Sequence, residues 1–220
     1  MPRTYLIKII SFIDYIMENK LHWENIYQTK KIDGVSWYQE TPSESIELIK
    51  KFSTTNSDMI IDIGCGKSFI ADNLLKLNYE NITLVDISKN ALKEVKERVN
   101  NKSLNFIETD VLNLKSEQTF DIWHDRAVFH FITEKEGIEK YISLCNEYIS
   151  KEGKLIIGTF AEDGPLKCSG LEIKRYSINN LKELFKENFE FIEGFKKLHS
   201  TPFDTQQSFT FCVFKKLTNR

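Results

Sequence analysis

Three carboxylates and a pair of glycines mark the places in this 220-residue chain where residue type and spacing suit ligand binding. Asp62 begins the segment Asp62-Ile63-Gly64-Cys65-Gly66, and Asp86 and Asp110 each end or follow a further apolar run. If these runs are parallel strands, the three acids share the carboxyl edge of one sheet, where ligands of open α/β sheets bind. Carboxylates there can accept hydrogen bonds from ribose hydroxyls and from the exocyclic amine of adenine. The spacing therefore predicts a site for an adenosine-containing ligand.

The glycine loop admits three other interpretations. Gly66-Lys67-Ser68 matches the end of a phosphate-binding P-loop, but that motif needs a glycine where the sequence has Ile61. A dinucleotide-binding fingerprint needs a third glycine where the sequence has Phe69, so this alternative is weakened and stays open. The third interpretation is a structural turn that binds nothing. Ligand binding is favoured because free N–H groups at a helix start suit a carboxylate or phosphate, and a side chain would block its approach.

Alternating apolar runs and helical patterns must position these residues. Short apolar runs predict strands buried on both faces, at 59–63, 82–86, 104–108, 120–124 and 153–160. Helices are expected around them at 18–29, 44–52, 68–77, 89–100, 134–150 and 178–187, with N-caps for three of these at Ser43, Ser88 and Ser177. Strands separated by crossover helices predict a parallel sheet wound in right-handed βαβ units.

The last third of the chain follows a different pattern. Two strands are expected in succession, at about 189–198 and 207–216, and residues 200–204 between them form a loop of hairpin size. A short loop forces an antiparallel pair. The sequence thus predicts an α/β fold in which a mostly parallel sheet, with helices on both faces, ends in a C-terminal antiparallel hairpin.

The composition is that of one globular domain, with 41% hydrophobic and 28% charged residues. A net charge of −2 gives no reason to expect a nucleic-acid partner. The cysteines form no C-x-x-C pair and the histidines lack metal-ligand spacing, so we expect no metal and a cytoplasmic protein with reduced thiols. Residues 5–17 are too short to span a membrane. They predict an extra amphipathic helix, with Met17 as an alternative start of the native chain.

Together the motifs resemble those of the class I S-adenosylmethionine (SAM) dependent methyltransferases over residues 44–216. The segment 62–66 resembles their first motif, Asp86 their second, Asp110 their third and 120–126 their fourth. Ser68 departs from the pattern, because many members have a third glycine there. The resemblance implies a Rossmann-like seven-stranded sheet, SAM as cofactor and methyl transfer as activity. The residues it assigns to the cofactor are Asp62, Gly64 and Gly66 at the methionine portion, Asp86 at the ribose, Asp110 and Val111 at the adenine, and Cys65 and Ile87 beside them.

A narrower resemblance concerns the N-terminal segment. The stretches 22–27, 36–39, 123–131 and 168–171 are similar to a group of small bacterial methyltransferases, itself similar to the mitochondrial enzyme that methylates a lysine of citrate synthase. In such relatives an aromatic N-terminal segment covers the cofactor. This implies a lid at residues 1–43 over a methyltransferase domain at 44–220, with cofactor contacts from Trp23, Tyr27 and Trp37. Plain core packing of these three rings is the alternative.

The catalytic candidates follow the fourth strand. Asp125 and Arg126 fall beside the expected methyl position, where they would contact the methionine moiety or orient the acceptor, and His130 is a candidate general base. The acceptor is left open. A protein lysine predicts an open acidic channel near Asp125, whereas a small molecule predicts an enclosed aromatic pocket under Trp37. A non-catalytic SAM-binding sensor or partner subunit is the alternative from another class.

Overall fold

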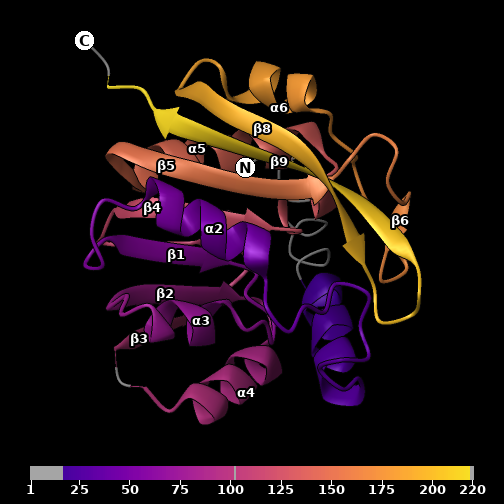
Figure 1. The fold of residues 1–220 in the computed structure, drawn as a ribbon. Coiled ribbons are helices and arrows are strands. Elements are labelled where there is room, and N and C mark those ends of the chain that lie inside the picture. Colours follow the sequence, from indigo (N-terminus) through magenta and orange to yellow (C-terminus); the bar gives the residue numbers. More distant parts are fainter. Residues whose placement is uncertain (1–16, 102, 219–220) are drawn as a thin grey trace, which may run out of the picture.

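The strands in the computed structural model, which describes residues 17–101 and 103–218, carry most of the architecture. They are β1 (Met59–Ile63), β2 (Asn81–Asp86), β3 (Leu104–Glu108), β4 (Phe120–Arg126), β5 (Ile149–Phe160), β6 (Lys167–Cys168), β7 (Leu171–Glu172), β8 (Phe189–Ser200) and β9 (Gln206–Lys216). Seven of them form one sheet in the order β3-β2-β1-β4-β5-β9-β8 (Figure 1). β1 to β5 pair in parallel, whereas β9 is antiparallel to both β5 and β8. The predicted mostly parallel sheet with a C-terminal hairpin is confirmed.

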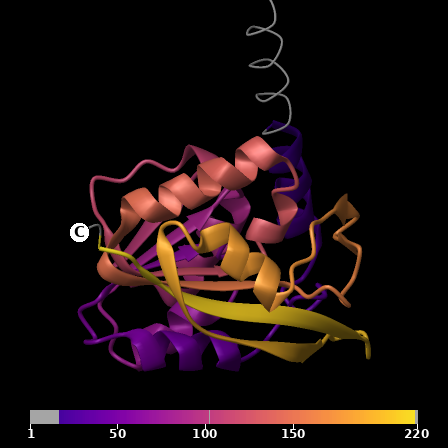
Figure 2. The same ribbon diagram turned by 90° about the horizontal axis from the view of Figure 1, so that it is seen from above.

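Helices cover both faces of this sheet. One face carries α2 (Ser43–Phe52), α3 (Ile70–Lys76) and α4 (Lys89–Val99), and the other carries α5 (Lys135–Tyr148) and α6 (Ile178–Phe185) (Figures 1 and 2). The two short 3-10 helices are η1 (Val111–Asn113) and η2 (Phe129–Phe131). A further helix over residues 17–29 lies beyond the carboxyl ends of the parallel strands (Figure 1).

Alternation along the strands divides the core into two clusters. Ile60, Ile122 and Ile156 face the cluster that contains α2, α3 and α4. Their neighbours Ile61, Trp123 and Ile157 face the cluster that contains α5 and α6. Successive side chains of a strand point to opposite faces, so an uninterrupted apolar run is needed where both faces are covered. Burial of each such side chain contributes about 1.5–3 kcal/mol.

Two of the three serines that were expected to cap helix N-termini do so. Ser88 accepts a hydrogen bond from the Ala91 N–H, and Ser177 forms a reciprocal capping box with Asn180. The expectation of Ser43 as an N-cap was wrong. The chain already turns at Pro42, so Ser43 is the first helical residue and its hydroxyl donates backward to the Thr41 carbonyl.

Three boundaries differ from expectation. β4 continues through Arg126, because its ladder with β5 extends to Gly158. β5 begins at Ile149, with a register irregularity opposite β4. Residues 167–172, between the expected fifth strand and the helix at 178–187, form the small β6–β7 hairpin, which was not expected. No helix among the residues that the structure describes is long and apolar enough to cross a membrane. The helix expected at 5–17 lies outside the described residues except for Met17.

Candidate functional site

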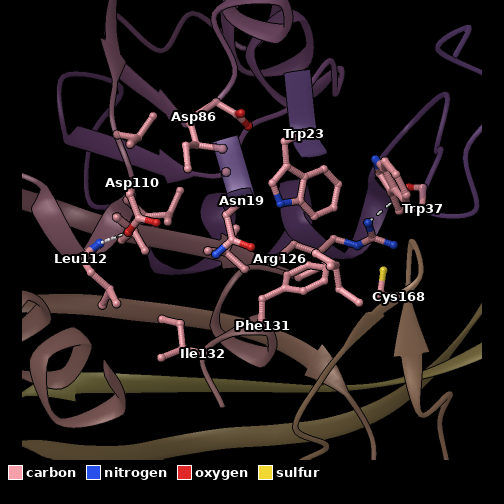
Figure 3. Close-up of a pocket in the computed structure, with 18 of the residues that line it drawn as sticks. Asn19, Trp23, Trp37, Asp86, Asp110, Leu112, Arg126, Phe131, Ile132 and Cys168 are labelled. Atoms are coloured by element: carbon pink, nitrogen blue, oxygen red, sulfur yellow. Dashed lines mark hydrogen bonds between the residues drawn. The ribbon is translucent and has the colours of Figure 1, made fainter. Parts of the chain in front are cut away.

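A cavity of about 270 Å³ lies at the carboxyl edge of the parallel strands, beneath the helix over 17–29 (Figure 3). Its walls come from the ends of β1, β2 and β4, from η1 and η2, and from the β6–β7 hairpin. A second cavity of about 60 Å³ adjoins it on the side of the glycine loop. Four residues line both cavities and stand between them: Tyr27, Trp37, Gly64 and Arg126.

The glycine loop between β1 and α3 adopts a backbone that other residues rarely reach. Gly64 has φ +64° and Gly66 has φ +53°. A Cβ atom on Gly64 would lie 2.0 Å from Val128 Cγ2, and one on Gly66 would lie 2.5 Å from the Tyr27 hydroxyl oxygen. Glycine is therefore required twice over, by conformation and by the close approach of neighbours.

Arg98 on α4 braces the far side of this loop. Its guanidinium donates to the carbonyls of Lys67 and Ser68, at 3.1 and 2.6 Å, and forms a bidentate pair with Asp72 at 3.0 and 2.8 Å. The planar fork of arginine suits such paired contacts. Sequence reasoning missed Arg98, because no motif or local spacing connects α4 with the loop.

Asp86 joins the end of β2 to the glycine loop. Its carboxylate accepts the Gly66 N–H and the Ser88 N–H, each at 2.8 Å. Burial raises the pKa of Asp86 to about 6, against the opposing effect of these two backbone hydrogen bonds. A carboxylate has about four acceptor positions. It therefore keeps acceptor capacity toward the cavity, which it lines.

The residues expected around an adenine gather at the same end of the large cavity. Asp110 caps η1 by accepting the Leu112 N–H at 2.7 Å, and burial raises the pKa of its carboxyl group. Ile87 and Val111 also line this end. Figure 3 shows Asp86 and Asp110 on one side of the cavity and Trp37, Arg126 and Cys168 on the other.

Asp62 does not share the large cavity with the other two acids. It lines the smaller one, together with Cys65, Gly66 and His124. Its Oδ1 lies 2.7 Å from His124 Nδ1, while its buried Oδ2 has no hydrogen-bond partner among the described residues. The three acids thus meet at one sheet edge but on two adjoining cavities.

The aromatic residues of the N-terminal segment close the large cavity from above. The Trp23 ring packs against Tyr27, Trp37 and Phe131, with ring centroids 6.0, 5.8 and 5.2 Å apart. Aromatic pairs of this kind contribute stabilising free energy in addition to that from burial of their apolar surface. All four rings also line the cavity. The rings of Trp23, Tyr27 and Trp37 therefore pack against one another and line the cavity at the same time.

Glu24 attaches the helix over 17–29 to the start of α4. Its carboxylate accepts hydrogen bonds from the Lys89 and Asn90 N–H groups and from the Asn90 side-chain amide, at 2.7, 3.2 and 2.6 Å. It also accepts from the Ser88 hydroxyl at 3.0 Å. A carboxylate here satisfies free N–H groups at the positive end of α4.

Asp125 is directed away from both cavities. It is fully buried, and it accepts the Val128 and Phe129 N–H groups and the Tyr141 hydroxyl, at 2.9, 3.1 and 2.6 Å. Burial raises its pKa to about 6, against these hydrogen bonds. The carboxylate holds the turn after β4, in which Ala127 has φ +76°.

Arg126 lies at the end of the large cavity opposite the acids. Its guanidinium stacks on the Phe209 ring at 4.7 Å and donates to the Trp37 carbonyl at 3.3 Å. Burial lowers its pKa to about 10, opposed by the negative charge of Glu44. A guanidinium has five N–H donors, and among the described residues no second hydrogen-bond acceptor holds it.

His130 lies behind the cavity wall rather than in it. Its ring packs against Phe131 and Phe160, its Nδ1 accepts the Phe160 N–H at 3.2 Å, and its buried Nε2 has no hydrogen-bond partner among the described residues. Burial, with the nearby charge of Arg126, lowers its pKa to about 3. His130 is therefore a neutral, packed histidine at physiological pH.

Several lining residues had no signal in the sequence. Phe131, Phe160, Cys168 and Phe209 line the end near Arg126, and Asn19 on the helix over 17–29 also lines the cavity (Figure 3). They come from distant elements, and a phenylalanine in a strand indicates core packing as readily as a pocket. Phe131 and Cys168 fell within segments that the narrower resemblance had singled out, but neither was assigned a role there.

The donors and acceptors of the two cavities fit SAM. Paired acids and apolar side chains suit an adenosine at one end, while a glycine loop and the unpartnered Asp62 oxygen suit an amino-acid moiety. No group of side chains that could hold a metal ion occurs within 17–101 and 103–218.

Comparison with known proteins agrees with this geometry. Residues 54–210 match the family model described as a methyltransferase domain. The chain is 28% identical over 141 residues to malonyl-[acyl-carrier protein] O-methyltransferase 2 of Ilyobacter polytropus, covering 63% of this chain and 52% of that one. It is 26% identical over 121 residues to the eEF1A lysine and N-terminal methyltransferase of Mus musculus, covering 53% of this chain and 17% of that one. The chain thus spans about half or less of the length of these curated relatives.

Solved structures share the fold over nearly the whole chain. The N-methyltransferase NodS from Bradyrhizobium japonicum, in complex with S-adenosylhomocysteine, superposes with a TM-score of 0.68 at 12% identity, covering 90% of this chain and all of that one. The 1,6-didemethyltoxoflavin-N1-methyltransferase of Burkholderia thailandensis superposes with a TM-score of 0.67 at 14% identity, covering 99% and 91%.

Proposed function

Because the chain belongs to the class I SAM-dependent methyltransferases, we propose that it transfers the methyl group of SAM to a small, flat molecule that carries an anionic or hydrogen-bond-accepting group. The observation that carries this proposal is the polarity of the large cavity. One end has the acids Asp86 and Asp110, and the other has Arg126 among aromatic rings.

The chain's own residues would bind and orient the reactants. Asp86 accepts from the ribose hydroxyls, Asp110 accepts from the adenine amine, and the glycine loop contacts the methionine portion. When bound, SAM supplies a methyl group carried on a sulfonium sulfur, and loss of that methyl group converts the sulfonium to a neutral thioether. The lid rings exclude water, and orientation of two bound reactants can contribute about 7–11 kcal/mol.

No side chain among the described residues is proposed as a general base. Asp125 is buried and occupied by three donors, and His130 has a pKa of about 3 and lies behind the cavity wall. A nucleophile with a free lone pair needs no general base. An anionic acceptor already has such a lone pair.

The same end of the cavity disfavours a lysine acceptor. A lysine was expected to require an open acidic channel near Asp125, but that carboxylate is buried and faces Tyr141. A lysine ammonium would also approach the positive charge of Arg126, and like charges in a buried site repel. A carboxylate, phenolate or thiolate would be attracted, and aromatic rings at Phe131, Phe160 and Phe209 suit a flat apolar body.

Incubation of the purified protein with methyl-radiolabelled SAM and a cell lysate, followed by size fractionation, tests the proposal. Label in small metabolites is the expected result. Label in a protein band would overturn the small-molecule acceptor in favour of a protein lysine. Retained SAM binding without any transferred label would favour a sensor or partner subunit. Asp86→Asn is the control, because its weakened SAM binding should reduce label in every fraction.

A further inference from the structure

Three buried polar side chains form a chain of hydrogen bonds beneath the glycine loop. His124 Nδ1 lies 2.7 Å from Asp62 Oδ1, and His124 Nε2 lies 2.9 Å from the Ser45 hydroxyl. Each of the three residues is at most 2% exposed. They come from different elements: Asp62 and His124 are register partners in β1 and β4, and Ser45 lies on the buried face of α2.

The motif resemblance assigns only Asp62 of the three to the cofactor, and nothing in the sequence connects Asp62 with Ser45. Among the described residues, the Ser45 hydroxyl has His124 as its only hydrogen-bond partner. The His124 ring has Ser45 and Asp62 as its only two partners. Buried polar groups are retained where they are fully paired or where they hold a neighbour in place. One oxygen of Asp62 is held in this way.

The other oxygen is the exception. Asp62 Oδ2 is buried without a hydrogen-bond partner within the described chain, and Asp62 lines the smaller cavity beside Gly64 and Gly66. A buried, unpaired carboxylate oxygen costs free energy unless a ligand supplies a donor. A positively charged donor fits best, because Asp62 is an acid in a site of low dielectric.

The order Ser–His–Asp resembles a hydrolytic triad, but the geometry argues against nucleophilic catalysis by Ser45. Its hydroxyl is buried at 1% exposure within α2, and Ser45 lines neither cavity. A nucleophile must reach its substrate. The chain of hydrogen bonds therefore begins at Ser45, which lines neither cavity, and ends at Asp62, which lines the smaller one.

We propose that His124, anchored by Ser45, is a positioning residue that holds Asp62 so that Oδ2 accepts a hydrogen bond from the α-ammonium group of the cofactor's amino-acid moiety. In this arrangement the Ser45 hydroxyl would donate to Nε2, and Nδ1–H would donate to Asp62 Oδ1. This inference rests on the proposed function, because it requires SAM in the site.

Two probes separate positioning of the amino-acid moiety from general loss of structure. S-adenosylhomocysteine carries the ammonium group, whereas 5′-methylthioadenosine has the same adenosine and thioether but no amino-acid moiety. For Ser45→Ala and His124→Gln, calorimetry should show affinity for S-adenosylhomocysteine reduced about tenfold, as expected for a misplaced hydrogen bond to a charged group. Affinity for methylthioadenosine should stay within about twofold of wild type. Asp62→Asn is the reference variant and should show the same selectivity.

The outcomes are distinct. Equal losses for both probes, or no loss for either, would overturn the positioning role of His124. If His124→Gln does not fold, Ser45→Ala decides alone, since it removes one hydroxyl from a helix that favours alanine. Failure of the wild-type protein to bind S-adenosylhomocysteine would instead overturn the proposed function, which the variants do not test.

Discussion

The Asp86 carboxylate accepts the Gly66 N–H at 2.8 Å, and this bond links the end of β2 to the glycine loop that follows β1. The same carboxylate accepts the Ser88 N–H at the start of α4. One acid therefore sets the distance between the two loops that we assign to the ribose and to the methionine portion. Changes at Asp86 should act on loop geometry as well as on direct contact.

The first prediction concerns pH. Burial raises the pKa of Asp86 to about 6, so the carboxylate is ionised above that pH and protonated below it. Since the ionised form is the acceptor for ribose hydroxyls, SAM affinity should fall as the pH drops through about 6. Calorimetry between about pH 5 and pH 7.5 would measure this fall. Asp86→Asn should bind SAM weakly, and its affinity should not depend on pH in this range. If Asp86→Asn instead kept the wild-type pH profile, Asp86 would not be a ligand of SAM.

Gly66→Ala should weaken SAM binding through a collision rather than through backbone strain alone. Its Cβ atom would lie 2.5 Å from the Tyr27 hydroxyl, and its φ is +53°. We expect at least about a tenfold loss of affinity and a stability cost of about 1–2 kcal/mol. Gly170→Ala is the matched control: φ there is +83°, but nothing lies within 4 Å of the added Cβ. Gly170→Ala should lose stability and keep SAM affinity, and equal affinity losses would refute the collision.

Glu24→Ala should release the lid from α4. The substitution leaves the Lys89 and Asn90 N–H groups without their carboxylate, and hydrogen bonds to a charged group contribute about 1.5–3 kcal/mol. SAM affinity should fall about tenfold or more, and hydrogen exchange of the helix over 17–29 should accelerate. Glu18, which is exposed on the same helix, provides the control substitution Glu18→Ala. Unchanged exchange in Glu24→Ala would show that Trp23 and Tyr27 hold the lid without it.

Arg126→Met should separate stability from function. Arg126 is a half-buried cation whose guanidinium donates one hydrogen bond to the Trp37 carbonyl at 3.3 Å, so the loss of its hydration is poorly compensated. Replacement by an apolar side chain of similar length is often neutral or stabilising. Melting temperature should therefore hold or rise and SAM affinity should change little, while methyl transfer to small metabolites falls at least about tenfold. Undiminished transfer would exclude Arg126 from acceptor binding.

Asp125 should contribute to the stability of the fold and not to catalysis. Asp125→Ala removes the acceptor of the Val128 N–H, the Phe129 N–H and the Tyr141 hydroxyl, and should cost at least about 2 kcal/mol in chemical denaturation. Asp125→Asn should cost much less, because an amide can still accept and donate in that site. The folded-state pKa of about 6 lies above the ordinary value of 3.8. The wild-type protein should therefore lose stability as the pH rises from about 4 to about 6, and this loss should shrink in Asp125→Asn.

Such a pH series also separates the two buried acids. Asp86 contributes a loss of stability of the same sign over the same window, so only the difference between wild type and Asp125→Asn reports on Asp125. A difference that is flat with pH would mean that the Asp125 carboxyl group titrates near its ordinary value.

Local chemistry made much of the fold predictable. The apolar runs 59–63 and 104–108 match β1 and β3 to the residue, and Ser88 and Ser177 cap their helices as expected. These features depend on neighbours within a few residues, which is why a single sequence carries them. The expectation for Ser43 failed because the conformation at Pro42 decided where α2 begins.

The sequence by itself determined that glycines and acids lie at the ends of successive strands, since the order of apolar runs and turns specifies a parallel sheet. It did not determine which cavity each acid lines, or that Asp125 faces Tyr141 while Arg126 lies in the cavity with the aromatic rings. Successive residues of a strand point to opposite faces, so adjacent positions in one motif acquire opposite roles once helices cover the sheet. The partners Glu24–Asn90, Arg98–Ser68 and Ser45–His124 were decided only by tertiary packing, because they join segments far apart in the chain.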